Sequence, residues 1–203
     1  KKWKKVFLNP LLIAIVIVIA FLLITGISYE TYKYGAKYLS YFLTPVTVCL
    51  AVPLYKQMET LKKNMAAILI SILIGCIVHA GVLVAVAAVC KVDQQLLLSV
   101  MSKSVTTAIA LGVTNEIGGI QGITVIGVMI AGISGAVVGP ALLKIFHITE
   151  PVAQGLAMGS SAHAVGTSKA IELGETQAAM SSLAIVVTGI LTVVIVPWVV
   201  SLL

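Results

Sequence analysis

Two short polar stretches interrupt an otherwise apolar chain and concentrate side chains that can bind a ligand. Residues 159–169 read Gly-Ser-Ser-Ala-His-Ala-Val-Gly-Thr-Ser-Lys, and residues 102–107 read Ser-Lys-Ser-Val-Thr-Thr. Polar groups at membrane depth are normally buried against protein or line a wet cavity, and an ionisable one is a candidate for function. Both stretches are therefore predicted to belong to a ligand-binding site.

The side chains of these stretches favour a small anion, most simply a carboxylate. Lysines supply positive charge, hydroxyls donate hydrogen bonds, and helix N-termini add unpaired amides with a partial positive charge. The predicted substrate-binding residues are Lys103, Ser104, Thr106, Thr107, Ser160, Ser161, His163, Thr167 and Lys169. Because His163 can titrate near neutral pH, it is the first candidate for proton coupling, with Glu116 and Glu172 as alternatives. The competing interpretation is that the lysines extend to the membrane interface and the hydroxyls only satisfy backbone groups.

The composition predicts an integral membrane protein. The chain has 203 residues, of which 60% are hydrophobic and only 10% are charged, against roughly 25% charged in a soluble domain. The net charge of +6 arises from lysines at the ends of apolar segments. That placement indicates membrane topology and not nucleic-acid binding.

Five apolar segments are long enough to be predicted as transmembrane helices: residues 11–28, 38–55, 64–90, 117–143 and 176–203. A span needs about 20 residues, and the lysine-rich start of the chain is expected on the cytoplasmic side. Pro45 and Pro53 make the second span either a kinked or a broken helix. Residues 29–37, which contain tyrosines and lysines, are predicted to form an interfacial loop.

Residues 93–116 and 151–172 each have apolar halves around a polar centre, and neither half is long enough to cross a membrane alone. Each segment is either one interrupted crossing helix or a re-entrant hairpin. A shift of 56 positions places Ser104 on Ser160 and Thr107 on His163.

This shift predicts two repeat units, residues 64–116 and 117–172, inside one transmembrane domain that covers residues 1–203. The repeat is inverted if the polar tips are re-entrant and parallel if both segments cross, and the position of Lys144 favours inversion. The predicted fold is therefore an all-α polytopic membrane protein with an inverted repeat of the secondary-transporter type.

Catalytic and metal-binding patterns are absent from the sequence, so we expect no enzyme activity, no cofactor and no metal. There is no Gly-x-Ser-x-Gly elbow, no nucleotide-binding fingerprint, and only three scattered histidines. Of these, His79 lies inside an apolar span and is interpreted as a hydrogen-bonding partner of a neighbouring helix. The three cysteines are interpreted as small apolar residues.

Seven blocks of the sequence resemble the LrgB/CidB family of bacterial membrane proteins: residues 8–12, 51–55, 103–107, 116–119, 139–140, 161–170 and 172–175. The Lys-Ser-Val-Thr-Thr and Ser-Ala-His-Ala-Val-Gly-Thr blocks are the specific ones. The chain departs from the family pattern at Ala108, where members usually have proline. It also begins without the further N-terminal helix that members usually have.

The resemblance implies two functions. The family is called antiholin-like or holin-like and is associated with murein hydrolase activity and autolysis, together with a small LrgA/CidA-type partner. Relatives that include a plastid glycolate/glycerate translocator and bacterial pyruvate transporters imply a carrier of small carboxylates. Two matched polar tips favour the carrier: proton-coupled transport of pyruvate, glycolate, glycerate or lactate by alternating access. The resemblance also implies a multi-pass protein of the bacterial inner membrane that forms a homodimer or higher oligomer and binds no nucleic acid.

Overall fold

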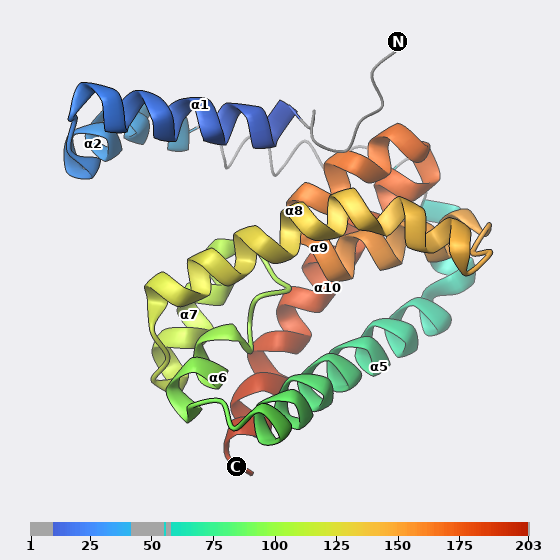
Figure 1. Ribbon diagram of the computed structural model, residues 1–203. Helices are drawn as coiled ribbons and strands as arrows, with labels where there is room; N and C mark the ends of the chain where they lie inside the picture. Colours follow the sequence, from blue (N-terminus) through green and yellow to red (C-terminus); the bar gives the residue numbers. More distant parts are fainter. Residues whose placement is uncertain (1–9, 42–54, 56–57, 203) are drawn as a thin grey trace. The chain divides into compact units, whose positions relative to one another are not determined.

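The computed structural model describes residues 10–41, 55 and 58–202, and all elements in this part of the chain are helices. The chain divides into two compact units, Lys1–Leu50 and Ala51–Leu203. The first unit contains α1 (Pro10–Thr25) and α2 (Tyr29–Ser40) (Figure 1). The described helices of the second unit are α5 (Met58–Cys90), α6 (Gln94–Val100), α7 (Thr107–Ile117), α8 (Gln121–Ile145), α9 (Pro151–Leu173) and α10 (Glu175–Val200).

The first unit agrees with the sequence predictions only in part. Helix α1 has 16 residues, which corresponds to about 24 Å of helix and is less than the ~30 Å of a bilayer core. The predicted interfacial loop over residues 29–37 is wrong, because this segment is helix α2. Ser28 caps it by accepting a 3.3 Å hydrogen bond from the amide of Thr31. The predicted span over residues 38–55, with its two prolines, lies largely outside the described residues.

Three long apolar helices of the second unit confirm three of the predicted spans. In the described part of the chain, α5, α8 and α10 are long and apolar enough to cross a membrane. They leave large apolar side chains exposed, such as Val82 on α5 and Val194 on α10. Helices that are apolar on most of their surface are typical of a membrane environment. The second unit is therefore a helical membrane protein.

The first polar segment folds back on itself between α6 and α7. The Ser102 hydroxyl donates to the carbonyl of Ala110 over 3.2 Å, and the amide of Ile120 donates to the Ser99 hydroxyl over 2.7 Å. The first bond joins residues close to the turn and the second joins residues farther from it, as expected when two helices run antiparallel. Helices α6 and α7 therefore form a helical hairpin. Residues 101–106 form its tip, where the predicted interruption lies. Its re-entry into one side of a bilayer stays a prediction.

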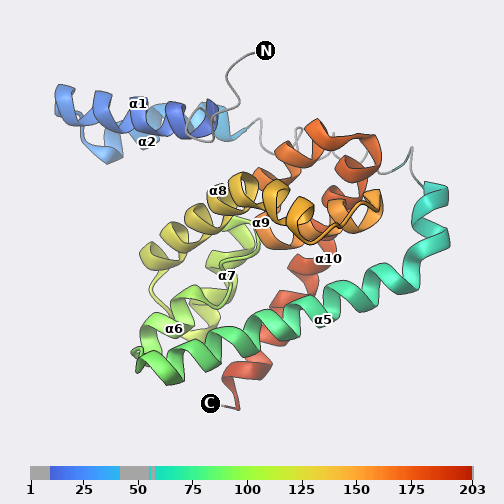
Figure 2. The same ribbon diagram turned by 45° about the vertical axis from the view of Figure 1, so that its right-hand side comes forward.

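The second polar segment also folds back, at a break inside α9. Ala162 and His163 have non-helical backbone angles, and the φ of His163 is +41°. The side-chain amide of Gln177, at the start of α10, donates to the side-chain oxygen of Gln154, near the start of α9, over 3.0 Å. Because the chain has returned beside its starting point, the two halves of α9 form a hairpin. Figures 1 and 2 both show α9 packed beside α10.

The two hairpins run in opposite senses relative to α8. Helix α6 runs with α8, because Ser99 contacts Thr124 and the next turn of α8 lies beside Lys103. The first half of α9 runs against α8, because Ala162 lies beside Gly135 and the earlier Met158 lies beside the later Gly139. This is the arrangement that an inverted repeat requires. The repeat itself, with units 64–116 and 117–172, stays a prediction.

Buried hydroxyls hold the first hairpin against α8. Thr124 donates to the carbonyl of Ser99 over 2.8 Å, and its oxygen lies 2.9 Å from the hydroxyl of Thr114. Thr114 in turn lies 3.1 Å from the hydroxyl of Ser102. Because a hydroxyl has one proton and Thr124 gives its own to the Ser99 carbonyl, the Thr114 hydroxyl donates to Thr124. This network positions the tip that carries Lys103.

Candidate anion-binding cavity

A cavity of about 440 Å³ lies where the tip of the first hairpin meets α5, α10 and the first half of α9. Four of the predicted site residues line it: Lys103 and Ser104 from the first hairpin, and Ser160 and Ser161 from the second. The volume falls in the range of small-molecule sites in proteins. The structure therefore brings parts of both polar stretches to one cavity, as the sequence predicted.

Lys103 makes the cavity electropositive. It is half-buried, and among the described residues it is the only lysine of the lining, which contains no described aspartate or glutamate. Lys103 forms no ion pair with any described residue. A cation that is withdrawn from water without a counter-charge attracts an anion.

The two serines of the second hairpin cannot donate to a ligand in this conformation. Ser160 donates its proton to the carbonyl of Leu156 over 2.7 Å, and Ser161 donates to the carbonyl of Ala157 over 2.6 Å. A hydroxyl has one proton, so these side chains present only acceptor lone pairs to the cavity. These two hydroxyls therefore agree with the competing interpretation, in which the hydroxyls only satisfy backbone groups.

Two lining residues that the sequence analysis did not assign to the site have unused polar atoms. Nδ1 of His79 on α5 lies 3.4 Å from the Ser104 hydroxyl, and the ring also interacts with the backbone of Met101, while its Nε2 atom is buried and makes no described hydrogen bond of ordinary geometry. Oγ1 of Thr188 on α10 is likewise buried without a described partner. An unsatisfied buried polar group costs about 1–3 kcal/mol. One signal in the sequence was the spacing of Thr188 and Thr192, which places both on one face of α10.

His163 lies at the bend of α9 and does not line the cavity. Its side chain is 6% exposed, and Nε2 lies 3.0 Å from the carbonyl oxygen of Val128 on α8. A Cβ atom at Gly132 would lie 2.7 Å from the imidazole ring, so this glycine makes room for it. A non-glycine residue at positive φ costs of order 1–3 kcal/mol and needs support from its surroundings. The bond to Val128 provides such support.

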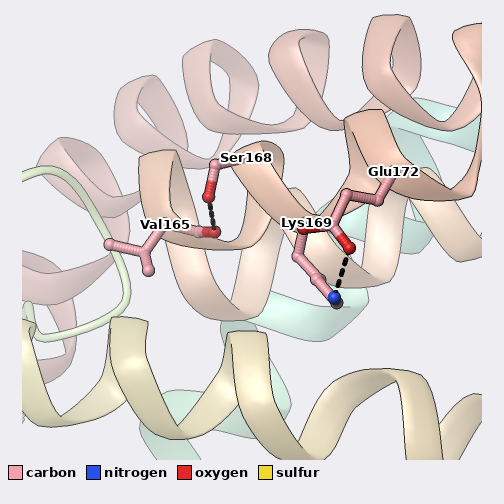
Figure 3. Close-up of polar contacts among 4 residues, drawn as sticks. All are labelled: Val165, Ser168, Lys169 and Glu172. Carbon is pink, nitrogen blue, oxygen red and sulfur yellow. Dashed lines mark hydrogen bonds and ion pairs between the residues drawn. The ribbon is translucent and has the colours of Figure 1, made fainter. Parts of the chain in front are cut away.

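Lys169 lies outside the cavity, on the second half of α9. It forms an ion pair with Glu172 one turn later. Figure 3 shows this pair and, separately, the Ser168 hydroxyl, which donates to the carbonyl of Val165. The side chains of Lys169 and Glu172 are 35% and 65% exposed. The structure thus gives the two predicted lysines different surroundings.

The remaining predicted residues also lie outside the cavity lining. Thr106 is the N-cap residue of α7 and makes no side-chain capping bond, while Thr107 and Glu116 are exposed. Thr167 is buried and lies 2.7 Å from the hydroxyl of Ser181 on α10. In this conformation these side chains contact backbone, other helices or the exterior.

Comparison with known proteins identifies relatives along almost the whole chain. The model of the LrgB-like family matches residues 1–202. The chain is 41% identical to the antiholin-like protein LrgB of Bacillus subtilis (strain 168) over 198 residues, which is 97% of this chain and 86% of the relative. It is 40% identical to the antiholin-like protein LrgB of Bacillus mycoides (strain KBAB4) over 189 residues, 93% of this chain and 82% of the relative. No solved structure matches the chain.

Proposed function

Because the chain belongs to the LrgB-like family, we propose that it is an antiholin-like protein of the bacterial inner membrane. The observation that carries this proposal is the identity of 40% or more, over most of both chains, to two proteins of that name. The three long apolar helices support insertion as a multi-pass protein. In this role it restrains murein hydrolase activity and autolysis, as a homo-oligomer or with an LrgA/CidA-type partner.

An antiholin-like role predicts that loss of the gene accelerates lysis. A deletion strain is expected to lose turbidity faster than its parent in detergent-induced autolysis and to release more murein hydrolase activity. Expression of the full-length protein in the deletion strain should restore the parental rate. Equal lysis rates in the parent, the deletion strain and the complemented strain would contradict the proposal.

A second candidate is transport of small monocarboxylates such as pyruvate, glycolate, glycerate or lactate. The cavity favours it, because its described lining has one lysine without a described counter-ion and no carboxylate, at the meeting point of two helical hairpins. In secondary transporters, the substrate-binding site usually lies where interrupted helical segments of two repeats meet. Alternating access would then expose the cavity to each side in turn, with His163, Glu116 or Glu172 as proton-coupling candidates.

Uptake into proteoliposomes tests the second candidate. The full-length protein, with its LrgA/CidA-type partner, is expected to take up labelled pyruvate and glycolate with saturation, with competition by lactate, and faster under an imposed pH gradient. An uncharged dye trapped in the same vesicles should stay inside. Leakage of the dye together with non-saturable uptake would instead indicate a holin-like pore.

A further inference from the structure

We propose that His79 and Thr188, and not His163, are the residues that bind the ligand's oxygen atoms in the cavity, with Lys103 as counter-charge for a small monocarboxylate. This inference rests on the second candidate function, because it assumes a carboxylate ligand. It assigns the binding role to α5 and α10, which carry neither polar stretch.

The two unused polar atoms belong to residues that line one cavity. Thr188 is 3% exposed, and neither its Oγ1 atom nor Nε2 of His79 has a described partner. They are the two buried side-chain polar atoms without partners in the described part of the chain, and both residues line this cavity. Since buried polar groups in proteins are nearly always hydrogen-bonded, a polar ligand or water completes them.

The chemistry of these atoms suits a carboxylate. When Ser104 donates to Nδ1 of His79, the neutral ring carries its proton on Nε2 and donates from there. The Thr188 hydroxyl has no described acceptor, so its proton is available as well. The other charged or titratable lining residues are Lys103 and Cys76. A carboxylate accepts several hydrogen bonds, and bonds to a charged group are the stronger ones.

Cys76 provides a reporter inside the cavity. It lies three residues before His79 on α5 and lines the same space, whereas Cys90 is exposed at the end of α5. Within these 203 residues, Cys49→Ser and Cys90→Ser leave Cys76 as the remaining thiol. In nanodiscs, its reaction with a small methanethiosulfonate reagent is measured with pyruvate, glycolate or the uncharged ester methyl pyruvate present.

Both acids are expected to slow modification of Cys76, and methyl pyruvate is not. His79→Phe and Thr188→Val, which keep the side-chain volume roughly constant, should raise the acid concentration needed for protection by about tenfold or more. The matched controls are His147→Phe, at an exposed histidine, and Ser182→Ala, at a buried α10 hydroxyl that donates to its own helix. These controls should leave protection unchanged.

Two results would overturn the inference: protection that neither acid provides, and protection that survives both His79→Phe and Thr188→Val. The first means that water alone completes the polar atoms. Uptake measured on the same variants separates the inference from the function on which it rests. Uptake without protection of Cys76 rejects the site and keeps transport, whereas protection without uptake keeps the site and rejects transport.

Discussion

The Gly159→Ala variant is expected to unfold about 5 °C below the wild-type protein, because one added methyl group has no room. A Cβ atom at this position of α9 would overlap the carbonyl oxygen of Ser181 and lie 2.8 Å from its Cα atom. It would also lie 2.9 Å from the Cβ atom of Ala184. The opposing atoms belong to the backbone or to the shortest side chain of α10, so no side-chain rotation relieves the clash.

The measurement is thermal unfolding of the full-length protein in detergent, followed by the loss of the monodisperse peak in size-exclusion chromatography. Gly112→Ala in α7 is the matched control, since a Cβ atom there has nothing within 4 Å. That control should be neutral or stabilise by up to about 1 kcal/mol, as replacing glycine by alanine in a helix usually does. Equal melting temperatures for both variants would mean that α9 and α10 do not pack as closely as described.

Lys103→Met is expected to lower carboxylate uptake by more than tenfold, while the same substitution at Lys169 leaves it nearly unchanged. Lys103 is the positive charge of the cavity and has no described counter-ion, so a bound carboxylate loses its charged partner. A hydrogen bond to a charged group contributes about 1.5–3 kcal/mol, which corresponds to a tenfold effect or more. Uptake of labelled pyruvate into proteoliposomes, with substrate concentration varied, measures the loss.

Lys169 is the matched control because both lysines are predicted from the sequence to have the same role. It is exposed and paired with Glu172 outside the cavity, and exposed ion pairs contribute ~1 kcal/mol or less. Similar losses for the two variants would show that both hairpins bring a charge to the ligand, as the repeat predicted. Lysis assays on strains that express the same two variants establish whether an antiholin-like role depends on the cavity.

The hydropathy of the chain was sufficient to predict three long apolar helices and the two interruptions. Helices α5, α8 and α10 come from uninterrupted apolar runs, and hydropathy is a local property that needs no knowledge of neighbours. The breaks near Lys103 and His163 were predictable because short apolar halves flank a polar centre. Helix α2 was missed because tyrosines and lysines indicate an interfacial position without deciding between loop and helix. The capping Ser28 was the available signal.

The sequence by itself determined a helical membrane protein with two polar tips, and it grouped Lys103, Ser104, Ser160 and Ser161, which the structure brings to one cavity. Only the tertiary structure decided which polar side chains face the cavity. A helical stretch presents its residues in all directions, so residue order alone could not separate Ser160 from His163 or Lys103 from Lys169. His79 and Thr188 are distant in sequence and lie in apolar helices, and only the packing of α5 and α10 around the first hairpin brings them to one space.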